Sequence, residues 1–315
     1  MEVIRARVLG FCMGVRRAVE ITLAALNAGN ETGVVYTLGP LIHNPEVLED
    51  LKKRNVNILQ PGADTLPDDL SGSTVIIRAH GISPLIEEEL SGRGAFIIDA
   101  TCPHVKSSQL KARSLSEQGF AVFLAGEKTH AEITGIRSYV KGPCFVTANP
   151  AEAENAAAEL AGKNPYAKTV LLGQTTINPE EYLDIGEAIK RYFPGIEIID
   201  TLCGAARERR NALTELSGKV DAFVIAGGKD SANTRRLLSI AENSVFRPID
   251  QKSNDEMSND KKPARKKAWL VENAAEIPPE VFSYSVIGLA AGASTPDKTI
   301  DEIELVLRKG SGCSF

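Results

Sequence analysis

Long apolar runs are absent from this sequence. No stretch approaches the roughly 18 to 20 consecutive apolar residues that a membrane-spanning helix needs. The first ten residues alternate like a strand, and Glu2, Arg5 and Arg7 carry charge where a signal peptide would be apolar. We therefore expect a cytoplasmic protein with no membrane partner.

An excess of positive charge is also absent. Lysine and arginine number 36 against 41 aspartates and glutamates, which gives a net charge of -5 and a pI near 5.6. A chain without an overall basic field is a poor candidate for binding nucleic acid, so any anionic ligand must be held by local groups. The length of 315 residues, with 43% hydrophobic and 24% charged residues, indicates a compact globular protein and excludes disordered, collagen-like and coiled-coil classes.

Cysteines are few and have no close partners in the sequence. The five are Cys12, Cys102, Cys144, Cys203 and Cys313. An odd number in so long a chain excludes a disulfide scaffold, and cytosolic thiols stay reduced. We interpret Cys144 and Cys313 as small hydrophobic residues, because unbridged cysteine is among the most buried residue types. The other three are candidates for ligand or catalytic use.

Short β-branched runs alternate with amphipathic stretches along the whole chain. This alternation is typical of an α/β fold with mostly parallel sheets. The expected strands are 2–8, 74–77, 96–98, 121–124, 170–172, 196–199, 222–225 and 285–287. The expected helices are 15–27, 46–53, 106–118, 179–192, 207–217, 234–243 and 297–309.

An internal repeat organises these elements. The segment 94–102, GAFIIDATC, resembles the segment 195–203, GIEIIDTLC, and a helical segment follows each. Cys12 also lies between a strand-like segment and a helix. We therefore predict three similar α/β units, at 14–99, 100–199 and 200–315, with the N-terminal strand 1–13 completing the third. Each unit places one cysteine at the carboxyl end of a strand.

The three matching cysteines form a candidate metal cradle. Cys12, Cys102 and Cys203 have Gly or Pro beside them at strand-to-helix junctions, where the amino terminus of a helix favours a thiolate. Structural zinc usually takes a fourth protein ligand and close Cys-x-x-Cys pairs, which are absent here. A 4Fe-4S cluster held by three thiolates is the other possibility, and it leaves one iron open.

Several expected strands end in small residues and a polar turn that opens a helix. Ligands bind at such strand ends, and helix amino termini favour anions. The turns contain Thr129–His130, Gln174–Thr176, Ser231–Asn233 and Ser294–Thr295.

Three of the four histidines also lie in turn-like contexts. They are His43, His80 and His130, and each is able to donate to a phosphate or transfer a proton near neutral pH. We interpret His104 as an ordinary surface histidine. The charged segment 251–267 is interpreted as a solvated loop, whose lysines are an alternative contact for an acidic redox carrier.

These motifs resemble one family, the 4-hydroxy-3-methylbut-2-enyl diphosphate reductases (the LytB/IspH family). The matching stretches follow the family's order from one end of the chain to the other. They are GFCMGVRRA at 10–18, GPLIHN at 39–44, RAHG at 78–81, DATCP at 99–103, QTT at 174–176 and AGASTPD at 291–297.

The resemblance implies a trefoil of three α/β units around one central 4Fe-4S cluster. Cys12, Cys102 and Cys203 would bind the cluster, and its fourth iron would stay open for the substrate hydroxyl. The reaction would reductively remove that hydroxyl as water and give isopentenyl and dimethylallyl diphosphate, the last step of the methylerythritol phosphate pathway. Electrons would come from a ferredoxin- or flavodoxin-type carrier, which agrees with the lack of G-x-G-x-x-G and Walker A motifs.

The resemblance also implies residue roles. Glu132 would supply the proton, Thr175 would complete a relay beside the substrate hydroxyl, and His130 would lie close to both. The diphosphate would be bound by a set of mostly neutral donors, namely His43, His80, His130, Ser231, Asn233 and Ser294.

The chain departs from the family pattern at Ala131, Ala206, Arg210 and Ala232 and in the insertion-like segment 251–267. Substitutions in ligand turns leave an alternative open: a paralogous three-cysteine 4Fe-4S reductase that acts on a different hydroxylated or unsaturated substrate. A non-catalytic iron-sulfur regulator or electron carrier is a third possibility, but it would have no reason to keep Glu132, Thr175 and the three turn histidines together.

Overall fold

The computed structural model describes residues 1–27, 33–60, 62, 65–244 and 265–310. It divides into two compact units. One unit comprises residues 1–12, 43–47 and 204–315, and the other comprises residues 13–42 and 48–203. Each unit is built on parallel β-sheets with helices on both faces.

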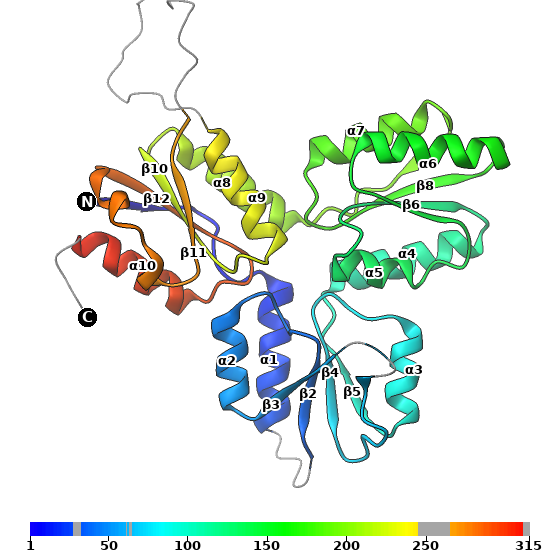
Figure 1. The fold of residues 1–315 in the computed structure, drawn as a ribbon, viewed down its shortest axis with the longest axis horizontal. Helices are drawn as coiled ribbons and strands as arrows, with labels where there is room; N and C mark the ends of the chain where they lie inside the picture. Colours follow the sequence, from blue (N-terminus) through cyan, green and yellow to red (C-terminus); the bar gives the residue numbers. More distant parts are fainter. Residues whose placement is uncertain (28–32, 61, 63–64, 245–264, 311–315) are drawn as a thin grey trace, which may run out of the picture. The chain divides into compact units, whose positions relative to one another are not determined.

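The first unit contains one four-stranded sheet in the order β1-β12-β10-β11. Its strands are β1 (Glu2–Arg5), β10 (Ala222–Ala226), β11 (Ala268–Val271) and β12 (Val286–Ala291). Val3 is in register with Ile287, and Val224 with Leu289. Helices α8 (Gly204–Ser217) and α9 (Ala232–Asn243) cover one face, and α10 (Asp297–Lys309) covers the other (Figure 1). Two short 3-10 turns, η2 (Ala274–Glu276) and η3 (Pro279–Ser283), lie between β11 and β12.

The second unit contains two sheets. One has the order β3-β2-β4-β5 and the other β7-β6-β8-β9. The sheet with the order β3-β2-β4-β5 contains β2 (Val35–Leu38), β3 (Val56–Leu59), β4 (Thr74–Ile77) and β5 (Phe96–Asp99). Helices α1 (Met13–Asn27) and α3 (Pro84–Gly92) lie on its opposite faces, and α2 (Pro45–Lys53) follows β2 in the chain (Figure 1).

The other sheet of this unit contains β6 (Ala121–Ala125), β7 (Cys144–Thr147), β8 (Thr169–Gly173) and β9 (Glu197–Ile198). Helices α4 (Pro103–Glu117) and α5 (Ala131–Arg137) cover one face, and α6 (Pro150–Lys163) and α7 (Pro179–Lys190) cover the other. Successive side chains of β6 therefore point into the hydrophobic cores on opposite faces of this sheet. Phe123 packs with Leu171 and Ile185, whereas Val122 packs with Ile133.

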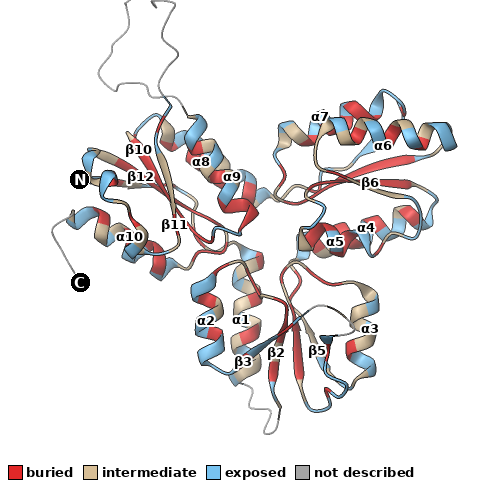
Figure 2. Cartoon of the chain, in the orientation of Figure 1, coloured by how far each residue is buried: buried red, intermediate tan, exposed pale blue. Residues whose placement is uncertain are grey.

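Burial on both faces explains why the central strands are continuous apolar runs. Every residue of β6, β8 and β10 is buried, and the strands stand out as the buried layer in Figure 2. Parallel sheets covered by helices have this pattern rather than an apolar-polar alternation. The helices begin where the sequence provides capping side chains or proline. Asn149 and Asn178 cap α6 and α7, and each is followed by a proline in the first turn.

The predicted fold class of three α/β units with parallel sheets is confirmed. The expected strands and helices are present, but the sequence analysis missed β2, β3, β7, β11, α3, α5 and α6. The interpretation of 251–267 as solvated is wrong at Lys266. This residue is 5% exposed, and its ammonium donates to the carbonyls of Ser217 and Val220. Residues 251–264 lie outside the described residues.

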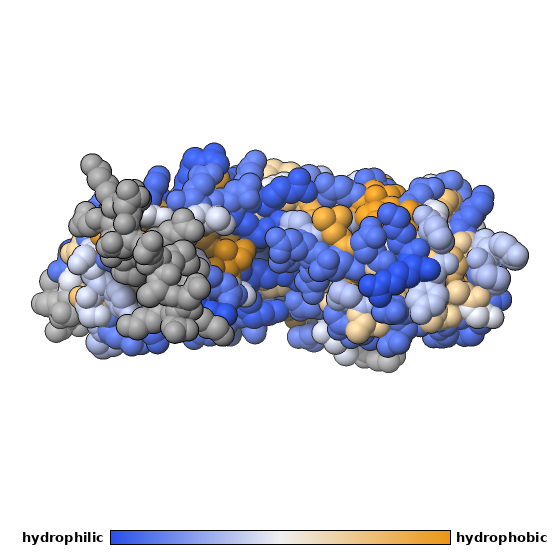
Figure 3. All heavy atoms as spheres, turned by 90° about the horizontal axis from the view of Figure 1, so that it is seen from above, coloured by the Kyte–Doolittle hydropathy of each residue, from blue (hydrophilic) through white to orange (hydrophobic). Residues whose placement is uncertain are grey.

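Within the described ranges, no helix is long and apolar enough to cross a bilayer. The molecular face drawn in Figure 3 is mostly hydrophilic, with small separate apolar areas.

Candidate functional site

Glu132 and Thr175 form a buried pair in the second unit. Glu132 lies in the first turn of α5 and is 2% exposed, and Thr175 follows β8 and is 7% exposed. The Oε1 atom of Glu132 accepts from the main-chain N–H of Thr175 at 2.6 Å, and Oε2 accepts from the Thr175 hydroxyl at 2.8 Å. Both carboxylate oxygens are therefore fixed by one residue on the neighbouring strand end.

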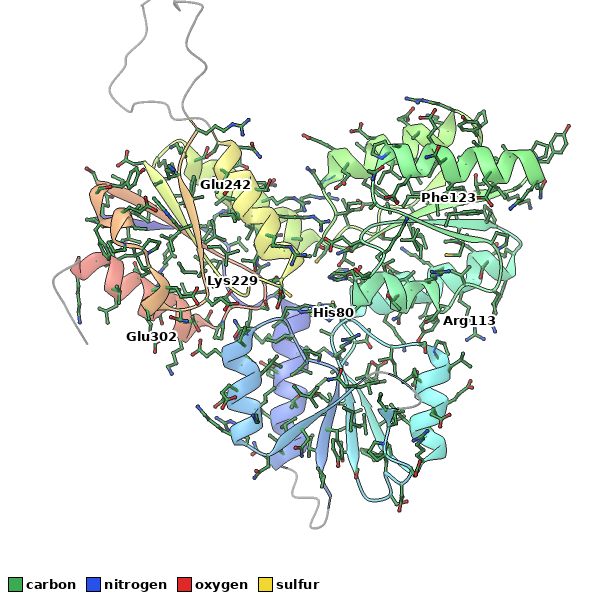
Figure 4. The ribbon with its side chains drawn as sticks, in the orientation of Figure 1. His80, Arg113, Phe123, Lys229, Glu242 and Glu302 are labelled. Carbon is green, nitrogen blue, oxygen red and sulfur yellow. The ribbon has the colours of Figure 1, made fainter. Side chains whose placement is uncertain are left out.

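His130 is the N-cap of the same helix. Its Nδ1 accepts from the main-chain N–H of Glu132 at 3.2 Å. Because an accepting ring nitrogen carries no proton, the neutral imidazole must hold its proton on Nε2. The ring of His80, which follows β4 and is labelled in Figure 4, meets the ring of His130 edge to face. The two ring centroids are 5.6 Å apart. The two histidines and Glu132 thus belong to one cluster.

Cys102 lies at the end of β5 and directly before α4. Its N–H donates to the carbonyl of Ala79 at 2.9 Å, which ties the cysteine to the turn that contains His80. Pro103 occupies the first turn of α4, where a missing N–H has no cost. The positive end of the helix favours the thiolate form of a cysteine at this position.

Asp99 fixes the loop that carries Cys102. Its carboxylate accepts from the N–H of Thr101 at 2.9 Å and pairs with the Lys106 ammonium at 3.0 Å. Burial alone would raise the pKa of Asp99, but the hydrogen bonds from Thr101 and Lys106 outweigh burial and lower this pKa below its usual value. The carboxylate is thus ionised and links the strand end to the helix start.

Cys203 joins the same set of contacts through its main chain. Its N–H donates to the carbonyl of Thr175 at 2.8 Å. Within the second unit, contacts therefore lead in an unbroken series from Cys102 through the two histidines, Glu132 and Thr175 to Cys203. The sequence analysis selected all six of these residues, and they lie in the segments that follow the carboxyl ends of β4, β5, β6, β8 and β9.

The first unit brings together other predicted residues. The N–H of Cys12 donates to the carbonyl of Ala293 at 3.0 Å, and the hydroxyl of the adjacent Ser294 donates to the carbonyl of His43 at 3.0 Å. The turn that follows β12 therefore contacts both Cys12 and His43.

The turn after β10 supplies the remaining candidates. Ser231 is the N-cap of α9, and its oxygen accepts from the N–H of Thr234 at 3.3 Å. Asn233 is 8% exposed, and its Nδ2 has no hydrogen-bond partner among the described residues. A buried amide donor costs free energy unless it finds an acceptor, so this position suits an anionic ligand. The turns after β10 and β12 share one sheet edge, where Ala226 is in register with Ala291.

The other cysteines and His104 lie outside these clusters. Cys144 lies in β7 and packs against the core, and burial raises the pKa of its thiol to about 11. This agrees with a structural role. His104 lies in α4 and is exposed. Cys313 lies outside the described residues.

Two arginines that sequence analysis missed contact the cysteine loops. Arg17 donates to the carbonyls of Asp99 and Thr101, and Arg209 donates to the carbonyl of Gly10. Their spacing in the sequence could have indicated them. Each arginine follows a candidate cysteine by five or six residues and lies in the helix that begins after that cysteine.

A comparison with known proteins gives the family. The family model described as "LytB protein" matches residues 3–308. The chain belongs to the LytB family. Its relatives include a protein of Treponema denticola that is 44% identical, with 98% of this chain and 100% of the relative covered. Another, from Solidesulfovibrio magneticus, is 35% identical with 98% and 99% covered. Both are named 4-hydroxy-3-methylbut-2-enyl diphosphate reductase.

Solved structures of LytB-family reductases resemble the fold. One, described as the structure of (E)-4-hydroxy-3-methyl-but-2-enyl diphosphate reductase, the terminal enzyme of the non-mevalonate pathway, has a TM-score of 0.67 at 32% identity, with 98% of this chain and 99% of that chain covered. The reductase structure from Plasmodium falciparum has a TM-score of 0.80 at 24% identity, with 96% and 87% covered, and supports the fold alone.

The cysteines of this LytB-family chain suit an iron-sulfur cluster by their chemistry. Cys12, Cys102 and Cys203 are half-buried, and none of the described cysteines is in a disulfide. Each directly precedes a helix, where thiolate ligands are favoured. Among the described cysteines the fourth, Cys144, lies in the core beside β6, and three thiolates match a cluster with one iron left open better than a closed zinc site.

Proposed function

We propose that this chain catalyses the reductive removal of the hydroxyl group from 4-hydroxy-3-methylbut-2-enyl diphosphate, giving isopentenyl and dimethylallyl diphosphate. Membership of the LytB family supports the reaction class. The single structural observation that carries the proposal is the buried Glu132–Thr175 pair beside the main chain of Cys203. It provides a proton donor next to a candidate cluster ligand.

We propose that Cys12, Cys102 and Cys203 hold one 4Fe-4S cluster. When bound, the cluster would supply single electrons and one iron with no protein ligand, which acts as a Lewis acid toward the hydroxyl group. The contact series that joins Cys102 to Cys203 supports this set. Chain connectivity supports the inclusion of Cys12 in this set. Cys12 precedes Gly14 by two residues, and the main chain of Gly14 packs directly on the sulfur of Cys102.

Glu132 would provide the proton with which the hydroxyl group leaves as water. Oxygen leaves far more readily as water than as hydroxide, and a positioned acid contributes roughly 10² to 10⁴-fold to such a step. The Thr175 hydroxyl lies 2.8 Å from Glu132 Oε2, so it can accept the carboxyl proton and donate its own onward. The His130 N-cap holds Glu132 in place and keeps a donor on Nε2.

The diphosphate would be bound by His43, His80, His130, Ser231, Asn233 and Ser294. These are mainly neutral donors, and the amino terminus of α9 adds a positive partial charge. The buried Nδ2 of Asn233 supports this assignment, because a phosphate oxygen would satisfy it. Such a site needs no overall basic field, which suits a chain with a net charge of -5.

Electrons would come from a small ferredoxin- or flavodoxin-type carrier, and the enzyme would work in the cytoplasm, where cysteine ligands stay reduced. A second candidate function is a paralogous reductase with the same cluster and a different substrate. Ala206 and Ala232 favour it, since both are buried near the proposed ligand turns and lack the hydroxyl that the family usually has.

The deciding experiment is anaerobic purification followed by iron and sulfide determination and turnover of 4-hydroxy-3-methylbut-2-enyl diphosphate with a chemical reductant. We expect close to four iron and four sulfide per chain, and both isopentenyl and dimethylallyl diphosphate as products. An intact cluster without turnover would reject the proposed substrate and favour the paralogue. Absence of a cluster after reconstitution would reject both.

A further inference from the structure

Two arginines each lie in a helix that begins directly after one candidate cysteine. Each donates hydrogen bonds to the main chain just before another candidate cysteine. Helix α1 begins directly after Cys12, and its Arg17 reaches the loop before Cys102. Helix α8 begins directly after Cys203, and its Arg209 reaches the loop before Cys12. The same arrangement thus occurs once in each compact unit, on unrelated stretches of sequence.

The Arg17 contact is the more extensive of the two. Its Nη1 donates to the Thr101 carbonyl at 3.0 Å, and its Nη2 donates to the Asp99 carbonyl at 3.2 Å. The planar guanidinium donates to two carbonyls of one loop from two different nitrogens, whose relative positions are fixed by the plane of the group. The two acceptors are the carbonyls one and three residues before Cys102, so the side chain holds the main chain from which the sulfur projects.

Gly14 allows close packing between α1 and the Cys102 loop. It is buried one turn before Arg17, and a Cβ atom built on it would lie 2.6 Å from the Cys102 sulfur and 3.0 Å from the Cys102 Cβ. No real side chain fits at that distance, so α1 is packed against Cys102 by its backbone. Arg17 and Gly14 together fix α1 against the Cys102 loop.

Arg209 is buried to 3% exposure. Its Nη2 donates to the Gly10 carbonyl at 2.5 Å and its Nη1 to the Ala205 carbonyl at 2.9 Å. Gly10 has φ +76°, a conformation that glycine adopts readily and other residues disfavour, and a Cβ there would lie 2.8 Å from the carboxylate of Asp297. The guanidinium thus fixes a glycine turn two residues before Cys12.

We propose that Arg17 and Arg209 are positioning residues for the three-cysteine cradle. This inference rests on the proposed function, because it gives the cradle a cluster to hold. Three thiolates that approach one centre repel one another until metal binds, and short loops alone are easily displaced. The arginines hold the loops of Cys102 and Cys12 through main-chain carbonyls.

The first test measures thiol accessibility in the full chain without metal. Wild type, Arg17→Gln, Arg209→Gln and the control Arg113→Gln are alkylated, and the rate at each cysteine is read by peptide mass spectrometry. Arg113 suits as control because it is an exposed arginine on α4 that pairs only with Glu117 (Figure 4). Loss of a hydrogen bond to a charged donor corresponds to about a 10- to 100-fold change in local opening.

We expect Arg17→Gln to accelerate alkylation of Cys102, and Arg209→Gln to accelerate that of Cys12, by about 10-fold or more, with Cys144 unchanged in both. Rates equal to those of Arg113→Gln would overturn the inference. An equal rise at every cysteine, Cys144 included, would also overturn it, since that result means general destabilisation. If a glutamine variant does not fold, Arg17→Lys and Arg209→Lys replace it, with an intermediate increase expected at the same cysteines.

The second test uses the reconstituted holoenzyme. Cluster loss is followed by visible absorbance after addition of an iron chelator, with circular dichroism as a check on folding. Removing groups that orient metal ligands typically weakens metal binding by about 10- to 100-fold, so we expect cluster loss to accelerate by a similar factor in both variants. A rate of cluster loss equal to that of wild type would reject the inference and leave the proposed function intact. Failure of the wild-type protein to take up a cluster would reject the proposed function, and the alkylation rates alone would then test the role of the two arginines.

Discussion

Substitution of Glu132 by Gln separates the proton-donor role from a structural one. Glutamine is isosteric with glutamate, and its amide oxygen can accept from the Thr175 N–H that now lies 2.6 Å from Oε1. Its NH₂ group can then donate to the Thr175 hydroxyl in place of the bond at 2.8 Å. Both contacts survive as neutral hydrogen bonds, so we expect the free energy of unfolding to change by only about 1 kcal/mol.

The same substitution removes the acidic proton. We therefore expect kcat/KM to fall by about 10² to 10⁴-fold, which equals about 2.7 to 5.4 kcal/mol of transition-state stabilisation. The assay is anaerobic turnover of 4-hydroxy-3-methylbut-2-enyl diphosphate with a chemical reductant, alongside iron and sulfide content and a melting curve. Iron content should match wild type, because the carboxyl group is not a proposed ligand.

Glu180 provides a matched control. It occupies the equivalent position in the first turn of α7, where the N-cap Asn178 accepts from its N–H, but its side chain is exposed. Glu180→Gln should leave turnover unchanged. Activity of Glu132→Gln within about threefold of wild type, with the cluster intact, would refute the assignment of Glu132 as the proton donor.

Three further predictions concern Asn233, Asp99 and Cys144. Asn233→Leu should weaken diphosphate binding about two- to tenfold in a calorimetric titration while thermal stability stays equal or rises, because the buried Nδ2 has no described partner; unchanged affinity would exclude it from the site. Asp99→Asn should lower stability at pH 7, where the carboxylate stabilises the fold because its pKa is below the unfolded value near 3.8. This difference from wild type should shrink as pH falls through the folded pKa in urea titrations, and a constant difference would contradict the linkage. Cys144 should be alkylated at pH 8 about 100-fold more slowly than an ordinary free thiol, since its pKa is near 11; rapid labelling would contradict its burial.

The sequence predicted the strands that form continuous apolar runs and missed several that are only partly buried. β6, β8 and β10 are buried on both faces and are therefore apolar throughout. In β7 and β11 only the last of four residues is fully buried, so neither shows the continuous apolar run of a central strand. α5 escaped detection because its seven residues span only two turns.

Candidate site residues were predictable one by one, but their contacts were not. Glu132 and Thr175 are 43 positions apart. They meet because β6 and β8 are parallel neighbours in the sheet, so the segments that follow the two strands begin at the same carboxyl edge. Local sequence does not record this pairing of strands. Arg17 and Arg209 were missed because an arginine in a helix has the same local pattern whether it faces solvent or a distant carbonyl.

Lys266 shows how averaging over a segment misleads. Its neighbours are charged, so the whole segment was assigned to solvent, yet its aliphatic stem is buried and its ammonium reaches two carbonyls. Burial lowers the pKa of this lysine. The composition of the segment is therefore a wrong guide at Lys266, which lies two positions before β11.

The pairing of β1 with β12 has a consequence for biosynthesis. Among the described residues, the sheet neighbour of this first strand to leave the ribosome lies some 280 residues later, so β1 cannot dock until almost the entire chain has been made. The hydrogen bond from the N–H of Cys12 to Ala293 forms equally late. A nascent chain that stalls before residue 286 therefore lacks the contacts that position Cys12.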